Sequence, residues 1–452
     1  MASTQVSDFG SSDSVLGVME VANKPEMGIP EMYIRPQQPS IRSDEPSLST
    51  IPVFDFKSLL HENSRDAQLL KLYTACKDWG FFQVVNHGVS SELLQKLKHE
   101  IEKFFQLPIE DKKKYQIRAG DVQGYGSVIR CKDQKLDWGD RFYMLINPVE
   151  RRKPYLLPQL PASLRESLES YWSELRKLGM EILGLLGKAI GMEMKEVEEF
   201  FDDGVQSVRM TYYPPCPKPE MVVGLTPHSD ATGITILHQL NGVEGLEIKK
   251  NGVWIPVTFL PDAFVVNVGD IMEILSNGTY TSIEHRVAVN KEKERISIAM
   301  FFNPRVEAEI GPVKSLLNSE NPPLFKTMLM EDYFKDFFSR NLNGKSHLDK
   351  MRLKDSSRQW NKLFDKFITI IGFERRKYGN CVYSNFKLFI VLLVYVDDIM
   401  TASNVKSEVE KVKVELNSEF DMKDLEAAMK MLGSLDAVCK RPTFEKSFTS
   451  LG

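Results

Sequence analysis

The sequence predicts an α+β protein in which a jelly roll or sandwich of short strands is flanked by helices, with an α/β segment appended at the C-terminal end. Between residues 205 and 305, seven or eight short runs of β-branched and aromatic residues are separated by Gly, Asn and Pro. This regular spacing is typical of a sandwich or jelly roll. On both sides of this region, apolar residues recur every three or four positions, which indicates amphipathic helices.

Composition narrows the classes of protein that fit this fold. The 452 residues suffice for two or three domains, and the net charge of −4 is unlike the basic face of nucleic-acid binders. The five cysteines form no C-x-x-C pair, which argues against a disulfide framework or a zinc site. The start lacks a secretory pattern, and the apolar run 388–396 is far shorter than the ~20 residues of a spanning helix. We therefore expect a cytoplasmic monomer without a membrane or nucleic-acid partner.

The N-terminal part divides into two predicted regions. Residues 1–50 are rich in Ser and Pro, and we expect a partly disordered lead-in. Residues 51–160 begin with the strand-like run "TIPVFDFKSLL" and continue with a helix over 66–78. At 79–89, "WGFFQVVNHGV" has aromatic and β-branched residues closed by Asn-His-Gly, which predicts a strand and a turn. We expect His87 in this turn to have a structural role.

Helices are predicted on both sides of the strand-rich core. Residues 161–204 are interpreted as a helical connector that contains the clearest helix, over 164–190. Residues 306–353 are interpreted as C-terminal helices, which return over 324–338. The helix over 164–190 has one apolar stripe, made of Leu164, Leu168, Trp172, Leu175, Leu178 and Ile182. No residue of that stripe has catalytic chemistry, so the stripe is expected to pack on the core.

The predicted core, 205–305, carries the strongest candidate site. In "TPHSDATG", His228 and Asp230 stand two positions apart, so in an extended segment both side chains lie on one face. His285, in "SIEHRVAV", begins another predicted strand of the same region. Two imidazoles and one carboxylate on one side of a metal suit non-haem Fe(II) and leave three coordination positions open. His238 is expected only to pack on the barrel.

A second pair of polar residues follows in "RISIAMFF". Arg295 and Ser297 again face the same way, while the residues between and after them are apolar. An arginine that points into a jelly roll requires an anionic partner. Because a guanidinium matches a carboxylate and the nearby hydroxyl adds a donor, the pair predicts a small dicarboxylate bound next to the metal.

These motifs resemble the iron(II)- and 2-oxoglutarate-dependent dioxygenases, most closely the plant branch of senescence-related proteins and alkaloid O-demethylases. The resemblance covers roughly residues 27–353 and includes "WGFFQVVNHGV", "YYPPCPKPE", "GLTPHSDATGITIL", "VNVGDIMEILSNGTYTSIEHR" and "KERISIAMFFNP". It implies a double-stranded β-helix core. It also implies Fe(II), 2-oxoglutarate as cosubstrate, O2, and ascorbate in support.

The resemblance also implies roles for single residues. His228, Asp230 and His285 are expected to bind Fe(II), and to be the catalytic centre. Arg295 and Ser297, assisted by the Tyr213 hydroxyl, are expected to bind the distal carboxylate of 2-oxoglutarate. Substrate contacts are expected from Tyr143, Phe301 and Asn303. The family usually has Asn where this chain has Thr211, so cosubstrate geometry or rate can differ without abolishing activity.

Residues 354–452 resemble part of the reverse transcriptase of copia-type retrotransposons, through "SRQWNKLFDKFITIIGFERRKYGNCVYSN" and "FIVLLVYVDDIMTASN". The aspartates Asp397 and Asp398 match two of three carboxylates that hold metal ions in that family. The third carboxylate lies in a part that this chain lacks, so we expect no polymerase activity. Outside its parent fold, the apolar strand in this segment is expected to expose an edge that promotes aggregation.

Three functions compete at this point. The first is an oxygenase that hydroxylates, O-demethylates or desaturates a ring-containing plant metabolite such as an alkaloid or flavonoid, with release of succinate and CO2. The second is a dioxygenase-fold binding protein whose catalysis is impaired by fusion to the retroelement fragment. The third is a polymerase fragment. The complete set of His228, Asp230 and His285 together with Arg295 and Ser297 favours the first.

Overall fold

The computed structural model divides into two compact units, Met1–Arg352 and Leu353–Gly452. In the first unit, the structure describes residues 17–24, 28–35, 51–61, 65–127, 134–319, 321–340 and 343–352. In the second, it describes residues 353, 364, 367–375, 382–385, 388, 390–395, 398–403, 405–419, 424–425 and 447–451. Each unit has its own hydrophobic core.

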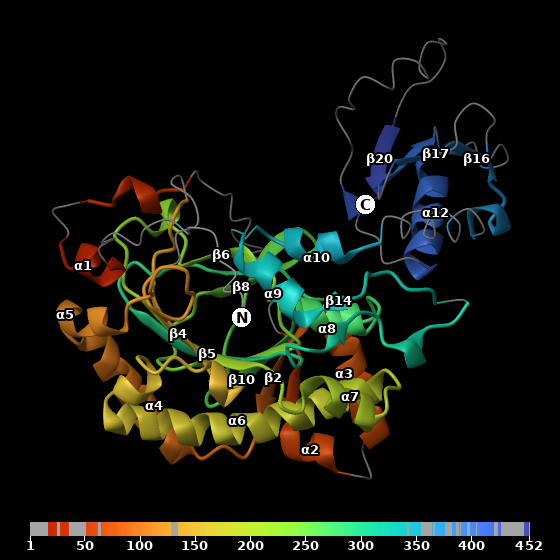
Figure 1. The fold of residues 1–452 in the computed structure, drawn as a ribbon. Coiled ribbons are helices and arrows are strands. Elements are labelled where there is room, and N and C mark those ends of the chain that lie inside the picture. Colours follow the sequence, from red (N-terminus) through yellow and green to blue (C-terminus); the bar gives the residue numbers. More distant parts are fainter. Residues whose placement is uncertain are drawn as a thin grey trace. The chain divides into compact units, whose positions relative to one another are not determined.

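Two β-sheets form the centre of the first unit (Figure 1). The larger, eight-stranded sheet has the order β1 (Val53–Asp55), β2 (Phe81–Val85), β10 (Phe264–Val268), β7 (Ile234–Gln239), β12 (Arg295–Phe302), β5 (Gln206–Tyr213), β4 (Asp140–Asn147) and β3 (Gly124–Tyr125). The smaller has the order β6 (Leu225–His228), β11 (His285–Val287), β8 (Leu246–Lys250) and β9 (Val253–Pro256). The predicted jelly-roll core flanked by helices is confirmed.

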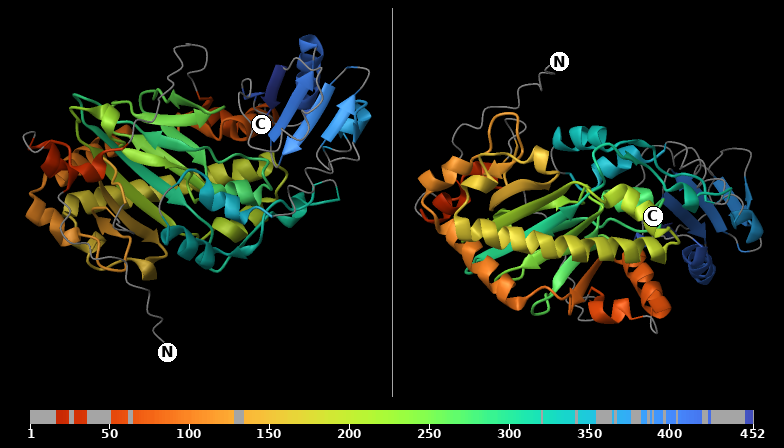
Figure 2. Two further views of the ribbon diagram at one scale, coloured as in Figure 1. Left: turned by 90° about the horizontal axis from the view of Figure 1, so that it is seen from above. Right: turned by 60° about the horizontal axis from the view of Figure 1, so that its bottom comes forward.

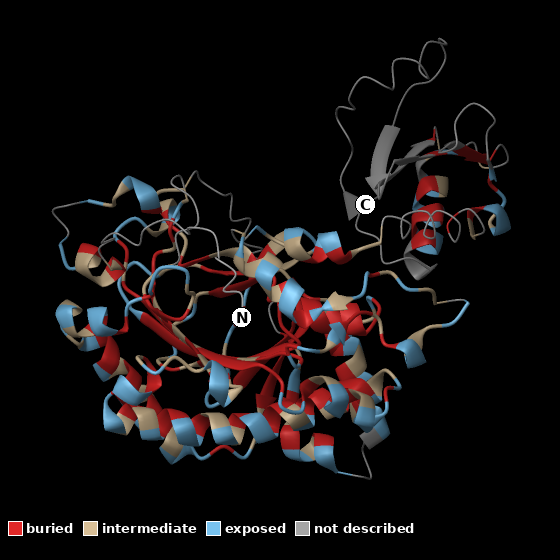
Figure 3. Ribbon diagram, viewed as in Figure 1, coloured by how far each residue is buried: buried red, intermediate tan, exposed pale blue. Residues whose placement is uncertain are grey.

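Long helices cover the outer face of the larger sheet, and Figure 2 shows α6 (Ala162–Ala189) running across it. Beside α6 lie α3 (Arg65–Asp78) and α4 (Ser91–Gln106). Five of the six stripe residues are buried, and only Trp172 is partly exposed, so the buried colour in Figure 3 follows the inner side of the helix. Gly179 permits the close approach, because a Cβ there would lie 2.4 Å from the Phe302 ring.

Shorter elements complete the first unit. Its remaining helices and strands are α1 (Val18–Ala22), η2 (Glu31–Tyr33), α2 (Phe56–Leu60), α5 (Ile109–Lys112), η5 (Lys113–Tyr115), η6 (Val149–Arg151), η7 (Leu157–Gln159), α7 (Met194–Phe201), η8 (Pro219–Met221), α8 (Asp270–Leu275), β13 (Glu309–Ile310), η9 (Lys314–Leu316), β14 (Met328–Leu329), α9 (Met330–Phe338) and α10 (Ser346–Met351). Within the N-terminal lead-in, Val18, Val21 and Tyr33 are buried in a small cluster with Trp138.

The C-terminal helix of the first unit starts later than the sequence indicates. The prediction placed a helix over 324–338, but α9 begins only at Met330. The preceding residues Met328 and Leu329 form β14, which pairs with β13, and Phe325 forms a bridge with Arg352. The backbone groups of this stretch are thus used in pairing between segments, which overrides its helical pattern.

The last residues of the first unit form hydrogen bonds with segments that lie next to the predicted metal site. Gly344 forms a bridge with His228, and the Gly344 N–H donates to the Pro227 carbonyl at 3.1 Å. The buried Glu273 carboxylate accepts hydrogen bonds from Lys345 at 3.0 Å and from Arg352 at 2.7 Å. Residues 343–352 therefore form hydrogen bonds both with the strand that ends at His228 and with Glu273 of the helix over 270–275.

The second unit is a sheet with a helix beside it in its described part. The strand order is β15 (Glu374–Arg375), β16 (Val382–Asn385), β17 (Ile390–Tyr395), β18 (Asp398–Ser403), β20 (Ser447–Leu451) and β19 (Asp424–Leu425), and the helix is α12 (Lys406–Glu419). The expectation of an exposed apolar edge is wrong for β17, because β16 and β18 pair with it on both sides. Ile390 and Leu392 are buried in the core of this unit. Asp397 lies outside the described residues.

Within the part of the chain that the structure describes, no helix is long and apolar enough to cross a membrane.

Removal of the second unit tests which residues the first unit needs. A chain ending at Leu353 should keep the 2-oxoglutarate turnover that the resemblance implies, within about twofold of the full chain, because the first unit retains its own hydrophobic core and every site residue that the sequence predicts. A chain ending at residue 342 should lose turnover, since it lacks Gly344, Lys345 and Arg352. Succinate formation by the three purified proteins measures this. Equal activity of the two shortened chains would contradict the role given to residues 343–352.

We expect the free energy of unfolding to decrease at acidic pH because of His238. This residue lies on β7, and its ring is edge-on to the ring of Phe264. Burial lowers the pKa of His238 to about 4, with a smaller effect from His87. As pH falls below ~6.5, the unfolded chain takes up a proton that the folded protein does not, so stability decreases until the pH reaches the folded pKa. Between pH 7 and pH 5 this amounts to about 2 kcal/mol.

Urea unfolding followed by tryptophan fluorescence at pH 7 and pH 5 checks this expectation. His238→Met should lose less stability on acidification than the wild type, whereas His99→Met, at an exposed position, should behave like the wild type. An identical pH dependence of His238→Met and the wild type would show that His238 does not cause the loss.

Candidate metal centre and substrate cavity

Three side chains converge at the end of the smaller sheet. β6 ends at His228, β11 begins at His285, and the two residues are direct partners in the antiparallel pair. Asp230 follows β6, and its Oδ1 lies 3.4 Å from Nε2 of His228 and 3.7 Å from Nε2 of His285. One ligand atom from each of the three buried residues lies within 4.8 Å of the others. Among the described residues, this is the one such group of metal-binding side chains.

Hydrogen bonds orient the three side chains for a metal. His228 Nδ1 contacts the Thr226 carbonyl at 2.7 Å, and His285 Nδ1 contacts the Ile283 carbonyl at 3.1 Å. A ring nitrogen that donates to a carbonyl leaves the other nitrogen, here Nε2, as a lone-pair donor to a metal.

The carboxylate of Asp230 is oriented in the same way. Its Oδ2 accepts hydrogen bonds from Thr235 at 2.7 Å and Asn267 at 2.8 Å, so Oδ1 faces the two imidazoles. Two nitrogen donors and one oxygen donor on one side of a point are the donor set that fits Fe(II).

The protonation states also suit metal binding. Burial, together with the neighbouring His228, lowers the pKa of His285 to about 4, so His285 is neutral at neutral pH. Burial by itself would raise the pKa of the Asp230 carboxyl. The adjacent imidazoles and the Asn267 amide more than offset this and hold that pKa below its usual range. A neutral imidazole and an ionised carboxylate are the forms that bind metals.

An inner cavity of about 60 Å³ lies between the two sheets and reaches from the three metal-binding side chains to Arg295, Ser297 and Tyr213. Arg295 is buried, and its Nη1 donates to Ser297 Oγ at 3.2 Å. The Arg295 Nε and Nη2 atoms are also buried but have no hydrogen-bond partner. Because a buried guanidinium requires an anion, these atoms fit one end of a small dicarboxylate. Thr211 lies opposite Ser297 in the strand pair and lines the same cavity.

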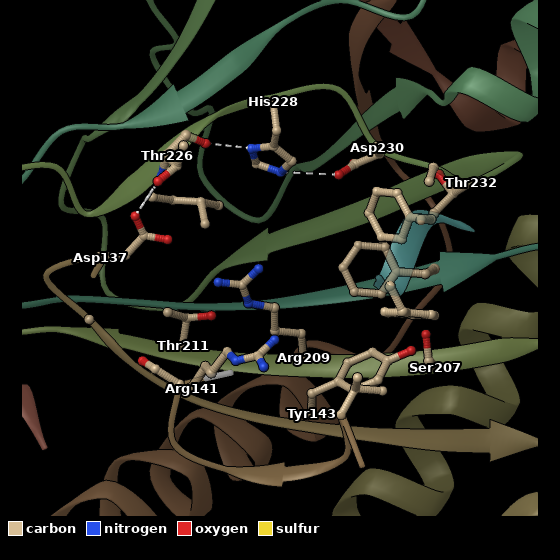
Figure 4. A pocket seen from close by; sticks show the side chains of 18 of the residues that line it. Asp137, Arg141, Tyr143, Ser207, Arg209, Thr211, Thr226, His228, Asp230 and Thr232 are labelled. Carbon is tan, nitrogen blue, oxygen red and sulfur yellow. Dashed lines mark hydrogen bonds and ion pairs between the residues drawn. The ribbon is translucent and has the colours of Figure 1, made fainter. Parts of the chain in front are cut away.

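A larger outer cavity of about 370 Å³ opens beside His228 and Asp230 (Figure 4). Tyr143, Phe301 and Asn303, the three residues expected to contact substrate, all line it. Sequence reasoning missed further wall residues, namely Arg141, Arg209, Phe334, Phe337 and Phe338. Two of these could have been found, because Arg141 and Arg209 occupy the same alternate positions of β4 and β5 as Tyr143 and Thr211. His87 lies elsewhere, with its Nε2 2.8 Å from the Asp262 carbonyl.

A jelly roll with this donor set, beside a buried arginine that lacks an anion, defines a class of non-haem metal enzymes that use a small carboxylate cosubstrate. The chain belongs to the 2OG-Fe(II) oxygenase superfamily, whose family model matches residues 204–304. Residues 51–163 match the family described as the N-terminal part of non-haem dioxygenases in morphine synthesis. The protein is therefore a 2-oxoglutarate-dependent non-haem iron dioxygenase, and its cofactors are Fe(II) and 2-oxoglutarate.

Known proteins match this chain within its first unit, and each match covers most of the length of the known protein. The chain is 48% identical to oxoglutarate-dependent flavonoid 7-O-demethylase 1 of Ocimum basilicum, over 77% of this chain and 93% of that protein. It is 47% identical to codeine O-demethylase of Papaver somniferum, over 76% and 98% respectively. The crystal structure of JOX2 in complex with 2OG, Fe and JA superposes with a TM-score of 0.68 at 35% identity, over 75% of this chain and 98% of that one.

The end of the chain has a different relationship. Residues 340–438 match the reverse transcriptase (RNA-dependent DNA polymerase) family. The resemblance of this segment to a reverse transcriptase, which the sequence indicated, is thus confirmed.

Proposed function

We propose that this protein oxidises a ring-containing plant metabolite, with removal of an O-methyl group as the favoured outcome over hydroxylation or desaturation. The observation that carries the proposal is the position of the outer cavity, which opens directly beside His228 and Asp230 and has five aromatic residues on its wall. The relatives that act as O-demethylases on flavonoid and alkaloid substrates support the outcome. The complete donor set favours catalysis over a binding function alone.

In this proposal, His228, Asp230 and His285 hold Fe(II), and Arg295 with Ser297 and Tyr213 holds the distal carboxylate of 2-oxoglutarate. When bound, the metal and the cosubstrate activate dioxygen and supply the oxidising power, with release of succinate and CO2. The chain contributes position and exclusion of water. The short inner cavity fixes the cosubstrate at one end, and the buried walls keep solvent from the reacting groups.

The outer cavity has the shape and polarity to hold an aromatic substrate. Phe301 lies in edge-to-face contact with Tyr143, with ring centroids 6.5 Å apart. A polar group of the wall can fix the orientation of the substrate ring. The buried Oδ1 atom of Asn303 has no hydrogen-bond partner, so it is available to accept a hydrogen bond from the substrate. The wall therefore combines aromatic surface with polar and charged groups, including Arg141 and Arg209, and polar groups of this kind orient the ligand in small-molecule sites.

Incubation of the Fe(II)-loaded protein with 2-oxoglutarate and a panel of methoxylated flavonoids, alkaloids and phenolic compounds tests the proposal. Products should show loss of CH₂, with formaldehyde and succinate formed in equal amounts. Products that gain one oxygen or lose two hydrogens would instead identify hydroxylation or desaturation. Absence of substrate-dependent succinate across the panel would contradict the proposed substrate class.

A further inference from the structure

The ring of His228 is oriented by a neighbouring residue, Thr226. Thr226 lies on β6, two positions before His228, and its carbonyl oxygen is 2.7 Å from Nδ1 of His228. A carbonyl that accepts a hydrogen bond from Nδ1 fixes the ring and leaves Nε2 as the lone-pair donor to a metal. The direction of the His228 lone pair therefore depends on the position of the Thr226 backbone.

Asp137 holds Thr226 by its backbone and its side chain together. The Thr226 N–H donates to Asp137 Oδ1 at 3.0 Å, and the Thr226 hydroxyl donates to the same oxygen. Figure 4 shows dashed lines that join Thr226 to Asp137 and to His228. Because the two bonds hold different parts of one residue, they restrict both the position and the rotation of Thr226. Asp137 thus acts one step behind the contact that orients His228.

Arg35 in turn fixes the carboxylate of Asp137. Its Nη2 lies 2.9 Å from Asp137 Oδ1 and donates to the Thr226 hydroxyl oxygen at 2.8 Å. The same nitrogen lies 3.4 Å from each of the carbonyl oxygens of Lys135 and Leu136. The side chains of Arg35 and Asp137 are 18% and 25% exposed, and partly buried ion pairs are screened by salt much less than exposed ones. Arg35, Asp137 and Thr226 therefore form one connected cluster.

The segment that carries Arg35 is itself docked on the first unit. The Arg35 N–H donates to the Met221 carbonyl at 2.9 Å. Two positions earlier, Tyr33 is buried with its ring edge-on to Trp138, at a distance of 5.4 Å between the ring centroids. Trp138 directly follows Asp137 in the chain. The docked N-terminal segment therefore holds Arg35 beside Asp137.

Two other roles for this cluster have less support. The three metal-binding side chains found among the described residues do not include Asp137. Arg35 and Asp137 both line the outer cavity, but they pair with each other, so together they present no net charge to a substrate. The contacts of Asp137 lead instead to Thr226 and, through the Thr226 carbonyl, to His228.

We infer that Arg35 and Asp137 are positioning residues for the Fe(II) centre, because they fix Thr226 and Thr226 fixes the ring of His228. This assignment rests on the proposed function, in which His228 holds the metal. It makes the N-terminal segment a part of the metal centre, although Arg35 stands 191 residues before Thr226 in the chain. Neither residue touches the metal or the reacting groups, so both act through Fe(II) affinity and ligand geometry.

The test is the dissociation constant of Fe(II) for the full chain, measured without oxygen by competition with a chelator of known affinity. Asp137→Ala should weaken Fe(II) binding by about tenfold, the lower end of the cost of losing a group that orients a metal ligand. Asp137→Asn keeps an acceptor oxygen for Thr226 and should recover most of this loss. The double variant Arg35→Ala, Asp137→Ala should stay within about twofold of Asp137→Ala alone, because both side chains act through one residue.

A matched variant separates positioning from general stability. Asp121 also pairs with a basic side chain, Lys153 at 2.8 Å, and accepts two backbone hydrogen bonds, but it has no printed contact with the metal centre. Asp121→Ala should lower the free energy of unfolding and leave Fe(II) affinity unchanged. The visible absorption of the Co(II)-loaded protein, which depends on ligand geometry, should change in Asp137→Ala and stay as in the wild type in Asp121→Ala.

The outcomes that overturn the proposal are distinct from those that overturn the proposed function. Wild-type Fe(II) affinity in Asp137→Ala, or an equal loss in Asp121→Ala, would contradict the positioning role. If Asp137→Ala does not fold, Arg35→Ala decides, and wild-type affinity together with an unchanged Co(II) spectrum would contradict that role. Unchanged Fe(II) affinity in His228→Ala would contradict the proposed function itself, because the metal would then be held elsewhere.

Discussion

Replacement of Asp230 by alanine is expected to abolish Fe(II) binding and 2-oxoglutarate turnover. Asp230 is the only oxygen donor of the three, and its Oδ1 faces both imidazoles at 3.4 and 3.7 Å. Its loss leaves two nitrogen donors for a metal that favours a mixed nitrogen and oxygen set. Because removal of a group that merely orients a ligand costs about 10- to 100-fold in metal affinity, loss of the ligand should cost more than about 100-fold.

Metal titration of the full chain, with succinate formation measured in parallel, checks this result. Asn267→Ala removes one hydrogen bond to Asp230 and should give an intermediate loss. Asp202→Ala, at an exposed position, is the matched control and should bind Fe(II) like the wild type. Retention of stoichiometric Fe(II) binding by Asp230→Ala would show that the metal is held elsewhere.

The second large effect is expected at Arg295. Arg295→Gln should weaken 2-oxoglutarate binding by about 10- to 100-fold, because hydrogen bonds to a charged group contribute about 1.5–3 kcal/mol each. Fe(II) binding should persist, since Arg295 lies on β12 and all three metal-binding side chains belong to β6, β11 and the segment after β6. The variant should therefore raise the KM for 2-oxoglutarate far more than it changes metal affinity.

Calorimetric titration of 2-oxoglutarate into the Fe(II)-loaded variants measures the effect. Ser297→Ala should show a smaller loss, because the hydroxyl is one donor beside the guanidinium. Arg176→Gln, which removes a surface arginine that pairs with Asp202, serves as the surface control. If Arg295→Gln bound neither Fe(II) nor 2-oxoglutarate, the result would contradict the role of Arg295 in binding the distal carboxylate and would indicate a structural role instead.

The parts of the site that could be predicted are those in which spacing fixes geometry. His228 ends β6 and Asp230 stands two positions later, while Arg295 and Ser297 stand two positions apart within β12. Residues two positions apart share a face in a strand, so this spacing was enough to predict each pair. Arg209 follows the same alternation with Thr211. It was missed because the sequence alone does not show which face of the strand is covered by the second sheet. An arginine on that strand is therefore equally compatible with a position that faces solvent.

Other features depended on contacts between distant segments. The phenylalanines of α9 line the outer cavity from a helix that begins only after residues 328–329 have paired with β13. The bridge between Gly344 and His228 spans more than a hundred residues of sequence. Likewise, the apolar strand β17 reads as an exposed edge in isolation but is covered by β16 and β18. The periodicity of apolar residues indicates which face of an element is buried, but it does not indicate which other element covers that face.

The most direct measurement of the central claim is the ratio of products formed from a methoxylated aromatic substrate by the full chain. Purified protein, supplied with Fe(II), 2-oxoglutarate and oxygen, should release succinate and formaldehyde in a ratio of about one to one, as expected if each decarboxylation is coupled to one substrate oxidation. Both products should disappear together in Asp230→Ala. Formaldehyde release that continues without 2-oxoglutarate, or in Asp230→Ala, would contradict the account.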